Sequence, residues 1–206
     1  MLTAGYLTIA DLKAQVLPPG LAARSDQDAK LAKLGLGVAA RFDRHIGGHL
    51  TREERTEERM GGPGIDWYFL SACPLETSGL TCLVVSAPGT ASESASAVTP
   101  DSIDVAAGLI KVPGVSSSDA LRTTYTGGYW LDDGDDAPAG STPLPDDLML
   151  AYLQQCTHEA DLLDLFGGGA TPKADDAAKL AALRRLEAGT LIASVRETLN
   201  GYVRFS

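Results

Sequence analysis

Basic residues, cysteines and long apolar runs are all scarce in this 206-residue chain. Its 17 Lys and Arg are outnumbered by 27 Asp and Glu, which gives a formal net charge of −10. This balance argues against broad binding to nucleic acid or to a membrane surface, because both need a basic field. The sequence also lacks an apolar run long enough to span a membrane. Its N-terminus has no basic stretch followed by an apolar one, so we expect no secretory signal.

Motifs of the common catalytic and metal-binding classes are missing as well. The three cysteines are odd in number and form no CxxC pair, so we expect small buried hydrophobes in a reducing compartment. There is no GxSxG motif, and the glycines at 167–169 are not followed in register by a P-loop lysine. The acidic run at 132–136 places Pro143 where a calcium loop needs glutamate. We therefore predict no enzyme activity, no cofactor and no metal.

Hydrophobic periodicity predicts helices near both ends of the chain. Thr8 and Asp11 have capping-box spacing at the start of a helix over 8–17. Apolar residues recur every three or four positions in a second helix over 25–47. Two more helices are predicted over 145–166 and 172–200. In the third, one face is expected to carry Leu148, Ala151, Tyr152, Gln155, Cys156 and Glu159.

The middle of the chain has strand character. Aromatic and β-branched residues predict antiparallel strands within a region of about 52–130. The charged segment 51–60 fits either an exposed strand or the tail of the preceding helix. Residues 86–100 are rich in Ala, Ser, Thr, Gly and Pro and predict a flexible loop. The expected class is α+β: one domain over 1–206, mainly a bundle of about four helices with an inserted β region.

One candidate metal site lies at the end of the second predicted helix. His45, His49 and Glu53 are spaced four apart, so a continuous helix would place them on one face, where they could bind zinc for a hydrolase. Gly47 and Gly48 interrupt that helix, and no HExxH pattern is present. The metal-dependent hydrolase is therefore a minor alternative.

Three segments together resemble the head–tail adaptor (connector) proteins of long-tailed phages and gene transfer agents. Residues 67–77 (WYFLSACPLET) resemble the family's strand that ends in a proline before a second strand. Residues 123–129 (TTYTGGY) resemble its strand end with a tyrosine, a small pair and an aromatic. Residues 144–151 (LPDDLMLA) resemble the helix start that follows. The resemblance covers roughly residues 8–165.

The resemblance implies a structural virion protein, made in the cytoplasm of a bacterial host. Such proteins form a homo-oligomeric ring, usually a dodecamer, beneath the portal protein. The ring extends the DNA channel and offers an attachment surface to a stopper or other tail-side protein. DNA would pass through the lumen without sequence-specific binding, and no membrane would be involved. Gly127, Gly128 and Pro145 are expected to act as a hinge between the β region and the next helix.

The C-terminal tail 201–206 is apolar for a chain end. We expect Tyr202, Val203, Arg204, Phe205 and Ser206 to form a portal interface by strand addition. The alternative is that this tail packs on its own helices.

Other classes fit the sequence less well. A stopper or tail terminator stays in the assembly class, but those proteins are mostly β and this chain has long terminal helices. A small DNA-binding packaging protein is disfavoured by the net charge of −10.

Overall fold

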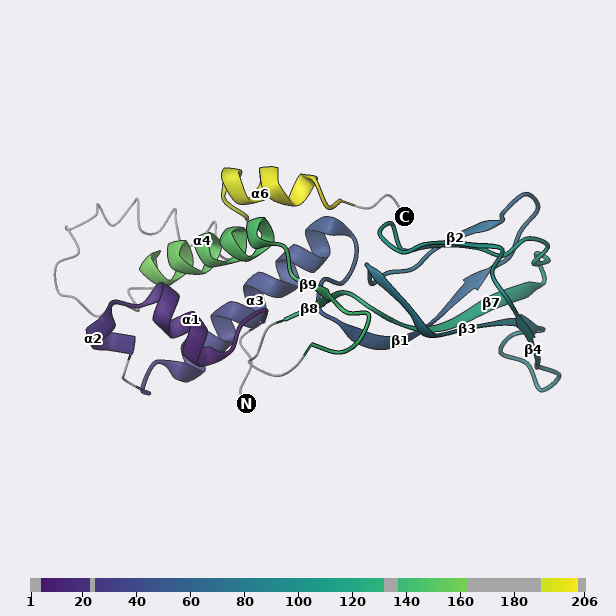
Figure 1. Cartoon of the computed structure of the whole chain (residues 1–206), viewed down its shortest axis with the longest axis horizontal. Helices are drawn as coiled ribbons and strands as arrows, with labels where there is room; N and C mark the ends of the chain where they lie inside the picture. Colours follow the sequence, from purple (N-terminus) through teal and green to yellow (C-terminus); the bar gives the residue numbers. More distant parts are fainter. Residues whose placement is uncertain (1–4, 23–24, 132–136, 163–189, 204–206) are drawn as a thin grey trace. The chain divides into compact units, whose positions relative to one another are not determined.

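The structure is a computed structural model that describes residues 5–22, 25–131, 137–162 and 190–203 (Figure 1). The chain divides into two compact units. We call residues 5–22, 25–46, 144–162 and 190–203 the helical unit, and residues 47–131 and 137–143 the β unit. The helical unit draws its elements from both ends of the sequence, whereas the β unit comes from the stretch between them.

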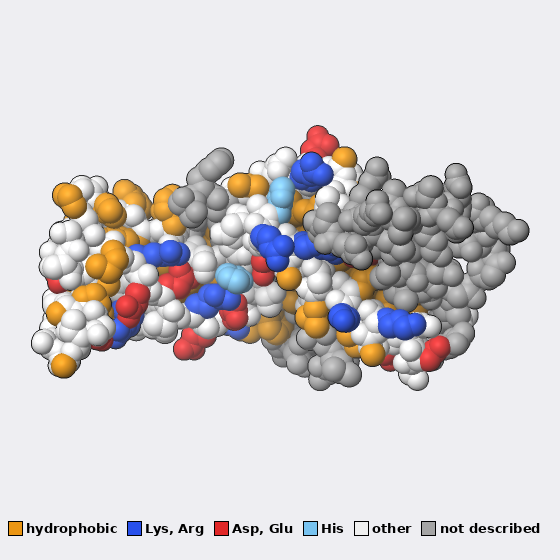
Figure 2. Space-filling model, turned by 180° about the vertical axis from the view of Figure 1, so that it is seen from behind, with side chains coloured by type: hydrophobic (Ala, Val, Ile, Leu, Met, Phe, Trp, Pro, Cys, Tyr) orange, Lys and Arg blue, Asp and Glu red, His pale blue; other side chains and the backbone are white. Residues whose placement is uncertain are grey.

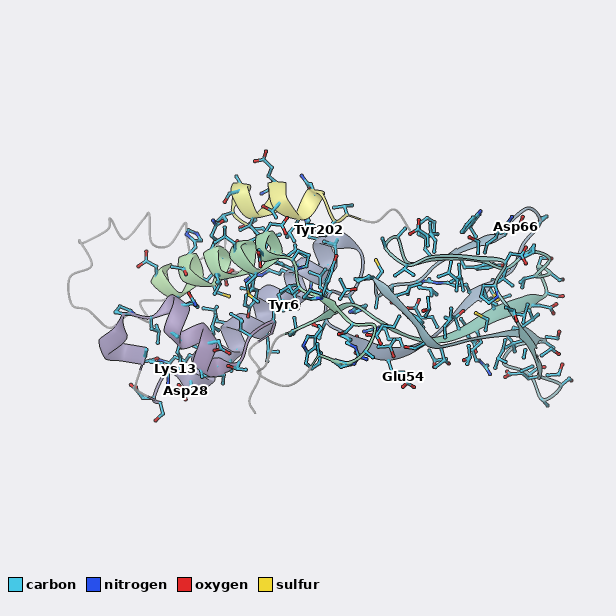
Figure 3. The ribbon with its side chains drawn as sticks, viewed as in Figure 1. Tyr6, Lys13, Asp28, Glu54, Asp66 and Tyr202 are labelled. Atoms are coloured by element: carbon cyan, nitrogen blue, oxygen red, sulfur yellow. The ribbon has the colours of Figure 1, made fainter. Side chains whose placement is uncertain are left out.

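The helical unit contains α1 (Ile9–Val16), the single turn α2 (Pro19–Ala22), α3 (Asp28–Ile46), α4 (Asp146–Leu162) and α6 (Ala193–Asn200). The helix start predicted at Thr8 is confirmed, because its hydroxyl oxygen accepts the Asp11 amide at 3.2 Å. The helix predicted over 25–47 is observed as α3. The ion pair between Lys13 and Asp28 joins α1 to α3 at 2.7 Å (Figure 3).

The core of this unit follows the predicted periodicity. Along α3 the buried hydrophobic residues are Leu31, Leu34, Val38, Phe42 and Ile46. On α4 the buried face matches the predicted one, with two polar members, Gln155 and Glu159. Aromatic rings meet at the centre, where Tyr6 and Tyr152 have ring centroids 4.9 Å apart. Tertiary packing of these stripes stabilises helices that would be marginal in isolation.

The β unit contains three sheets. The largest has the order β1-β7-β3-β4, formed by β1 (Glu53–Met60), β7 (Asp119–Gly127), β3 (Leu75–Ser86) and β4 (Ser94–Val98), all antiparallel. The second has the order β2-β6-β5, formed by β2 (Trp67–Phe69), β6 (Leu109–Lys111) and β5 (Ser102–Asp104). A parallel pair, β8 (Tyr129–Trp130) and β9 (Thr142–Pro143), completes the unit. The core between the larger sheets includes Tyr68, Ile110, Leu121 and Tyr125.

The segment predicted as a flexible loop at 86–100 contains a strand. Ser94–Val98 pairs with the end of β3, from Cys82↔Val98 to Ser86↔Ser94. The prediction of an unstructured loop is therefore wrong for these five residues. Their small side chains bury little, so the order comes from backbone pairing along β3, which the composition of the segment does not reveal.

Two further sequence predictions need correction. The helix expected to run from 172 to 200 is not continuous at its end, because residues 190–192 are non-helical and α6 begins at Ala193. The rest of it, the acidic run 132–136 and the glycines at 167–169 lie outside the described residues. The charged segment after α3 is strand β1 and not a helix tail, since Gly47 has φ +71° and ends the helix there.

The α+β class is confirmed. The finer description, a mainly helical bundle with a β insertion, is not, because sheets make up a large share of the described chain. Within the described ranges, no helix combines the length and the apolar character needed to cross a membrane.

Candidate functional site

Two of the three segments that carry the family resemblance pack directly on each other in the β unit. Leu75 lies opposite Gly127 in the antiparallel pairing of β3 and β7. The Gly128 amide donates to the Pro74 carbonyl at 2.9 Å. Residues 67–77 and 123–129 are thus one packed structure, which we call the strand junction.

The glycine pair of the strand junction is required by close backbone approach. A Cβ on Gly127 would lie 2.4 Å from the Ala72 carbonyl oxygen. A Cβ on Gly128 would lie 2.4 Å from the Thr51 carbonyl oxygen, and its φ of +99° is also unfavourable for other residues. The two glycines therefore let three chain segments cross in contact. Their predicted role as a hinge with Pro145 stays a prediction.

A half-buried carboxylate, Glu57, fixes the strand junction to β1. Glu57 accepts hydrogen bonds from the Ser71 amide at 3.0 Å and from the hydroxyls of Ser71 and Tyr125. Its ion pair with Arg59 measures 2.9 Å. The Tyr125 hydroxyl in turn accepts the Ala72 amide at 3.1 Å. A single residue of β1 thus binds both resemblance segments.

The ionisation states of Glu57 and Tyr125 suit a structural role. We call these two residues and the hydrogen bonds between them, Ser71 and Ala72 the Glu57–Tyr125 clamp. Burial opposes the charge on Glu57, but hydrogen bonds from Ser71 and Tyr125 outweigh it and lower the pKa of the carboxyl. Burial and the bond to Glu57 raise the pKa of Tyr125 to about 12. At neutral pH the carboxylate is charged and the phenol is neutral, so each keeps its bond. Proton transfer near neutral pH is not favoured by this arrangement.

A second pair, Arg52 and Glu76, joins the start of β1 to β3. The guanidinium donates two hydrogen bonds to the carboxylate, at 2.5 and 2.9 Å, and Glu76 is buried. No motif in the sequence marks Glu57 or Glu76 as a functional residue. In the sequence nothing singles out Glu57, because β1 is polar at seven of its eight positions; only the folded strand shows that Arg55 and Glu57 are less exposed than their neighbours.

The third resemblance segment begins α4 in the helical unit. Asp146 and Asp147 lie in the first turn, where the helix dipole favours acidic side chains. Pro145 comes just before the helix, and its carbonyl accepts the Met149 amide at 3.0 Å. The Tyr202 hydroxyl donates to the Asp147 carboxylate, with its oxygen 2.8 and 3.0 Å from the two carboxylate oxygens (Figure 3). This segment therefore anchors the chain after α6.

The residues predicted to contact a portal are only partly described. Tyr202 is held by Asp147, and Val203 is half-buried. Arg204, Phe205 and Ser206 lie outside the described residues. The observed contact fits the alternative of a packed tail as far as Tyr202.

The alternative of a metal site at His45, His49 and Glu53 required one continuous helix, and the structure does not have it. His45 lies in the last turn of α3, His49 forms a bridge with Ala72, and Glu53 begins β1. No continuous helix carries all three. In the described part of the chain no group of three or more His, Cys, Asp or Glu could hold a metal ion.

No known protein family matches this sequence, and no curated protein matches it. Solved structures, in contrast, match this chain. The chain aligns over its whole length with 93% of a chain from "Neck of empty GTA particle computed with C6 symmetry", with a TM-score of 0.60 and 15% identity. The same coverage holds for a chain from "Virion of native gene transfer agent (GTA) particle", with a TM-score of 0.58 and 13% identity.

A third match is a chain from "Neck of native GTA particle computed with C12 symmetry", with a TM-score of 0.54 and 14% identity. The protein is thus of the α+β class and has the fold of chains found in gene transfer agent particles.

Proposed function

We propose that this protein is a structural head–tail connector, or adaptor, of a phage or gene transfer agent particle. The observation that carries the proposal is the fold shared over the whole chain with chains from gene transfer agent necks. The strand junction supports it, because two of the three segments that resemble the adaptor family form one packed structure. Its place would be the virion, after synthesis in the bacterial cytoplasm.

The proposed assembly is a ring beneath the portal, built from twelve copies of a single adaptor domain over 1–206. The two matching necks were computed with sixfold and twelvefold rotational symmetry. In a ring, each copy offers one surface to the next copy and a different surface to the previous one. This chain would then need two distinct self-contacting surfaces, besides those for the portal and a tail-side protein.

The proposed ring would carry a strongly negative charge. Twelve copies at −10 each amount to about −120. An acidic lumen would let DNA slide without sticking, because phosphates are repelled. Purified rings that retain DNA equally at all salt concentrations would contradict this part of the proposal.

The portal contact is proposed for the chain end from Val203 to Ser206. Tyr202 is bonded to Asp147 and would fix where that end begins. Removing residues 203–206 while keeping Tyr202 should abolish portal binding and leave the helical unit folded. Unchanged portal binding by the truncated chain would reject the tail as the contact.

No catalytic role is part of the proposal. The half-buried Glu57 carboxylate and the buried Tyr125 phenol hold backbone segments together, which is a structural task. A stopper or tail terminator is not favoured, because those proteins are mostly β and five helices are described here.

Deleting the gene from a producing strain tests the proposed function. Heads filled with DNA and separate tails should accumulate, because the connecting ring is missing. Expression of the wild-type chain from a plasmid should restore joined particles. Normal tailed particles from the deletion strain would contradict the connector role.

A further inference from the structure

Strand β2 presents two large aromatic side chains to solvent. In the sheet β2-β6-β5, Tyr68 lies opposite Ile110, and both are buried in the core. Trp67 and Phe69 alternate with Tyr68, so they lie on the opposite face. They are 46% and 44% exposed. Hydrophobic side chains are visible on the surface of the β unit, at the left of Figure 2.

The same strand has an open backbone edge. The Val112 amide donates to the Asp66 carbonyl at 2.8 Å, and the Leu70 amide donates to the Gly108 carbonyl at 2.9 Å. Hydrogen-bonded and non-bonded pairs alternate in an antiparallel ladder, so Tyr68 is the next bonded partner of β6. The backbone amides and carbonyls of Trp67 and Phe69 therefore point away from β6, toward the open edge of the sheet.

The larger sheet has an edge of complementary character. Strand β4 is its last strand and reads Ser94-Ala95-Ser96-Ala97-Val98, with its first four residues exposed. It carries no charge and no proline, the features that usually protect an edge from pairing.

The other edges of the two larger sheets, within the described chain, are charged. Strand β1 is charged at six of its eight positions, Glu53, Glu54, Arg55, Glu57, Glu58 and Arg59. Strand β5 ends at the exposed Asp104, whereas no position within β2 or β4 is charged. Like charges on a facing strand would oppose pairing there. Uncharged open edges are thus confined to β2 and β4 among these four strands.

We propose that the open edge of β2 in one copy pairs with the open edge of β4 in the next copy. The rings of Trp67 and Phe69 would then cover the small side chains of β4, because neighbours on one sheet face lie side by side. Large residues facing small ones pack without clash. The contact joins two different surfaces of the chain, so it can repeat from copy to copy around a ring. The ring itself rests on the proposed function.

The contact should be weak between free chains. Strand β2 has three residues and β4 has five, so few hydrogen bonds form, each of about 1 kcal/mol net. Such a small surface falls below that of stable interfaces. We expect mostly monomers in dilute solution, with pairing favoured by high concentration or by a template.

Cross-linking of the full-length chain tests the pairing. Ile65, which is 44% exposed and lies just before β2, and Ser96 on β4 are replaced by cysteine and treated with a short bismaleimide. The three native cysteines are buried, and the wild-type chain is the control for their reaction. From micromolar to millimolar protein, Ile65→Cys/Ser96→Cys should give a ladder of oligomers.

The two single-cysteine variants show which strands meet between copies. Ile65→Cys alone and Ser96→Cys alone should stay monomeric, because β2 meets β4 and not its own copy. A dimer from Ile65→Cys alone would show β2 pairing with β2 and overturn the proposal. So would the absence of a ladder from the double variant at every concentration, or an equal ladder from Ile65→Cys/Glu54→Cys, which uses the charged edge.

A third substitution in the double variant tests the aromatic contribution. Trp67→Lys should reduce the cross-linked product by roughly tenfold or more, because a buried aromatic contact is lost. Leu36→Lys is the matched control, since Leu36 is 53% exposed but lies on α3. Circular dichroism checks that both variants fold. Equal yields from the two variants would overturn the role of Trp67.

The two proposals fail separately. A ladder with no ring at the particle vertex would keep the β2–β4 contact and reject the connector function. A ring whose neighbouring copies do not pair β2 with β4 would reject the contact and keep the function.

Discussion

The hydroxyl of Tyr125 donates a hydrogen bond to the Glu57 carboxylate while accepting the Ala72 amide at 3.1 Å. Tyr125→Phe removes both bonds and leaves a buried amide without a partner. We predict a loss of about 1–3 kcal/mol in the free energy of unfolding. Both tryptophans, Trp67 and Trp130, lie in the β unit, so their fluorescence during urea unfolding reports this loss.

Tyr68→Phe is the matched control for that measurement. Its hydroxyl lies in the same unit but makes a weak contact of 3.4 Å with the Ile65 carbonyl. If Tyr68→Phe lowers the free energy of unfolding as much as Tyr125→Phe does, the Glu57–Tyr125 clamp contributes no more to stability than an ordinary tyrosine hydroxyl of this unit.

The Glu57–Tyr125 clamp also predicts that the stability of the β unit depends on pH. The pKa of Glu57 is lowered from its ordinary value of 4.5 in the folded state. Its stabilising effect is therefore fully present above pH 4.5 and is lost as the pH falls through the folded pKa. Glu57→Gln should destabilise the β unit most near neutral pH, and the difference from wild type should shrink in acid.

Urea unfolding at a series of pH values measures this difference. Glu54→Gln, on the exposed side of the same strand, should show little change at any pH. A destabilisation by Glu57→Gln that is constant from about pH 7 to about pH 3 would contradict the assignment.

The glycine pair predicts a steric effect that can be separated from backbone strain. Gly128→Ala combines a positive φ with a Cβ 2.4 Å from the Thr51 carbonyl, whereas Gly114 has φ +78° but open space. Gly114→Ala should cost about 1–2 kcal/mol. Gly128→Ala should cost clearly more, and Gly127→Ala should be costly without a positive φ. Equal midpoints of urea unfolding for Gly114→Ala and Gly128→Ala would contradict this account.

In the helical unit, we expect the hydrogen bonds of Gln155 to stabilise α6 against local unfolding. Its side-chain carbonyl accepts the Ile192 amide at 3.0 Å, and its amide donates to Glu159 at 2.7 Å. Gln155→Ala should raise the hydrogen-exchange rate of the amides in α6 by about tenfold, the equivalent of one lost hydrogen bond. Gln154→Ala, at an exposed neighbouring position, should leave those rates unchanged. Equal exchange in both variants would count against the link.

Net charge predicts how assembly responds to salt. Copies at −10 repel each other, and the proposed β2–β4 contact has no charges that salt would weaken. Raising the salt from about 0.1 M to about 1 M shortens the screening length from about 10 Å to about 3 Å. Oligomers detected by sedimentation velocity should therefore increase with salt. A decrease would indicate contacts built on ion pairs.

Local patterns in the sequence predicted α1, α3 and α4, but not the non-helical residues 190–192 before α6. Thr8 and Asp11 signal a helix start through short-range hydrogen bonds, and the buried face of α4 follows helical spacing. Such signals act over a few residues, so one sequence is enough to read them.

The β unit was harder to predict because its determinants are distant in sequence. Glu57 and Tyr125 lie 68 residues apart, and nothing local marks them as partners. The strand Ser94–Val98 has the composition of a loop and is ordered by pairing with β3. The aromatic residues around Tyr68 predict a strand, but which of its faces is buried follows only from the pairing with β6 and the exposure of Trp67 and Phe69 in the fold.

Cryo-electron microscopy of the producing particle, at the vertex where DNA enters, tests the central claim most directly. The account predicts a ring of this chain between portal and tail, with strand β2 of each copy beside β4 of the next. A vertex with no density for this chain would contradict the connector function.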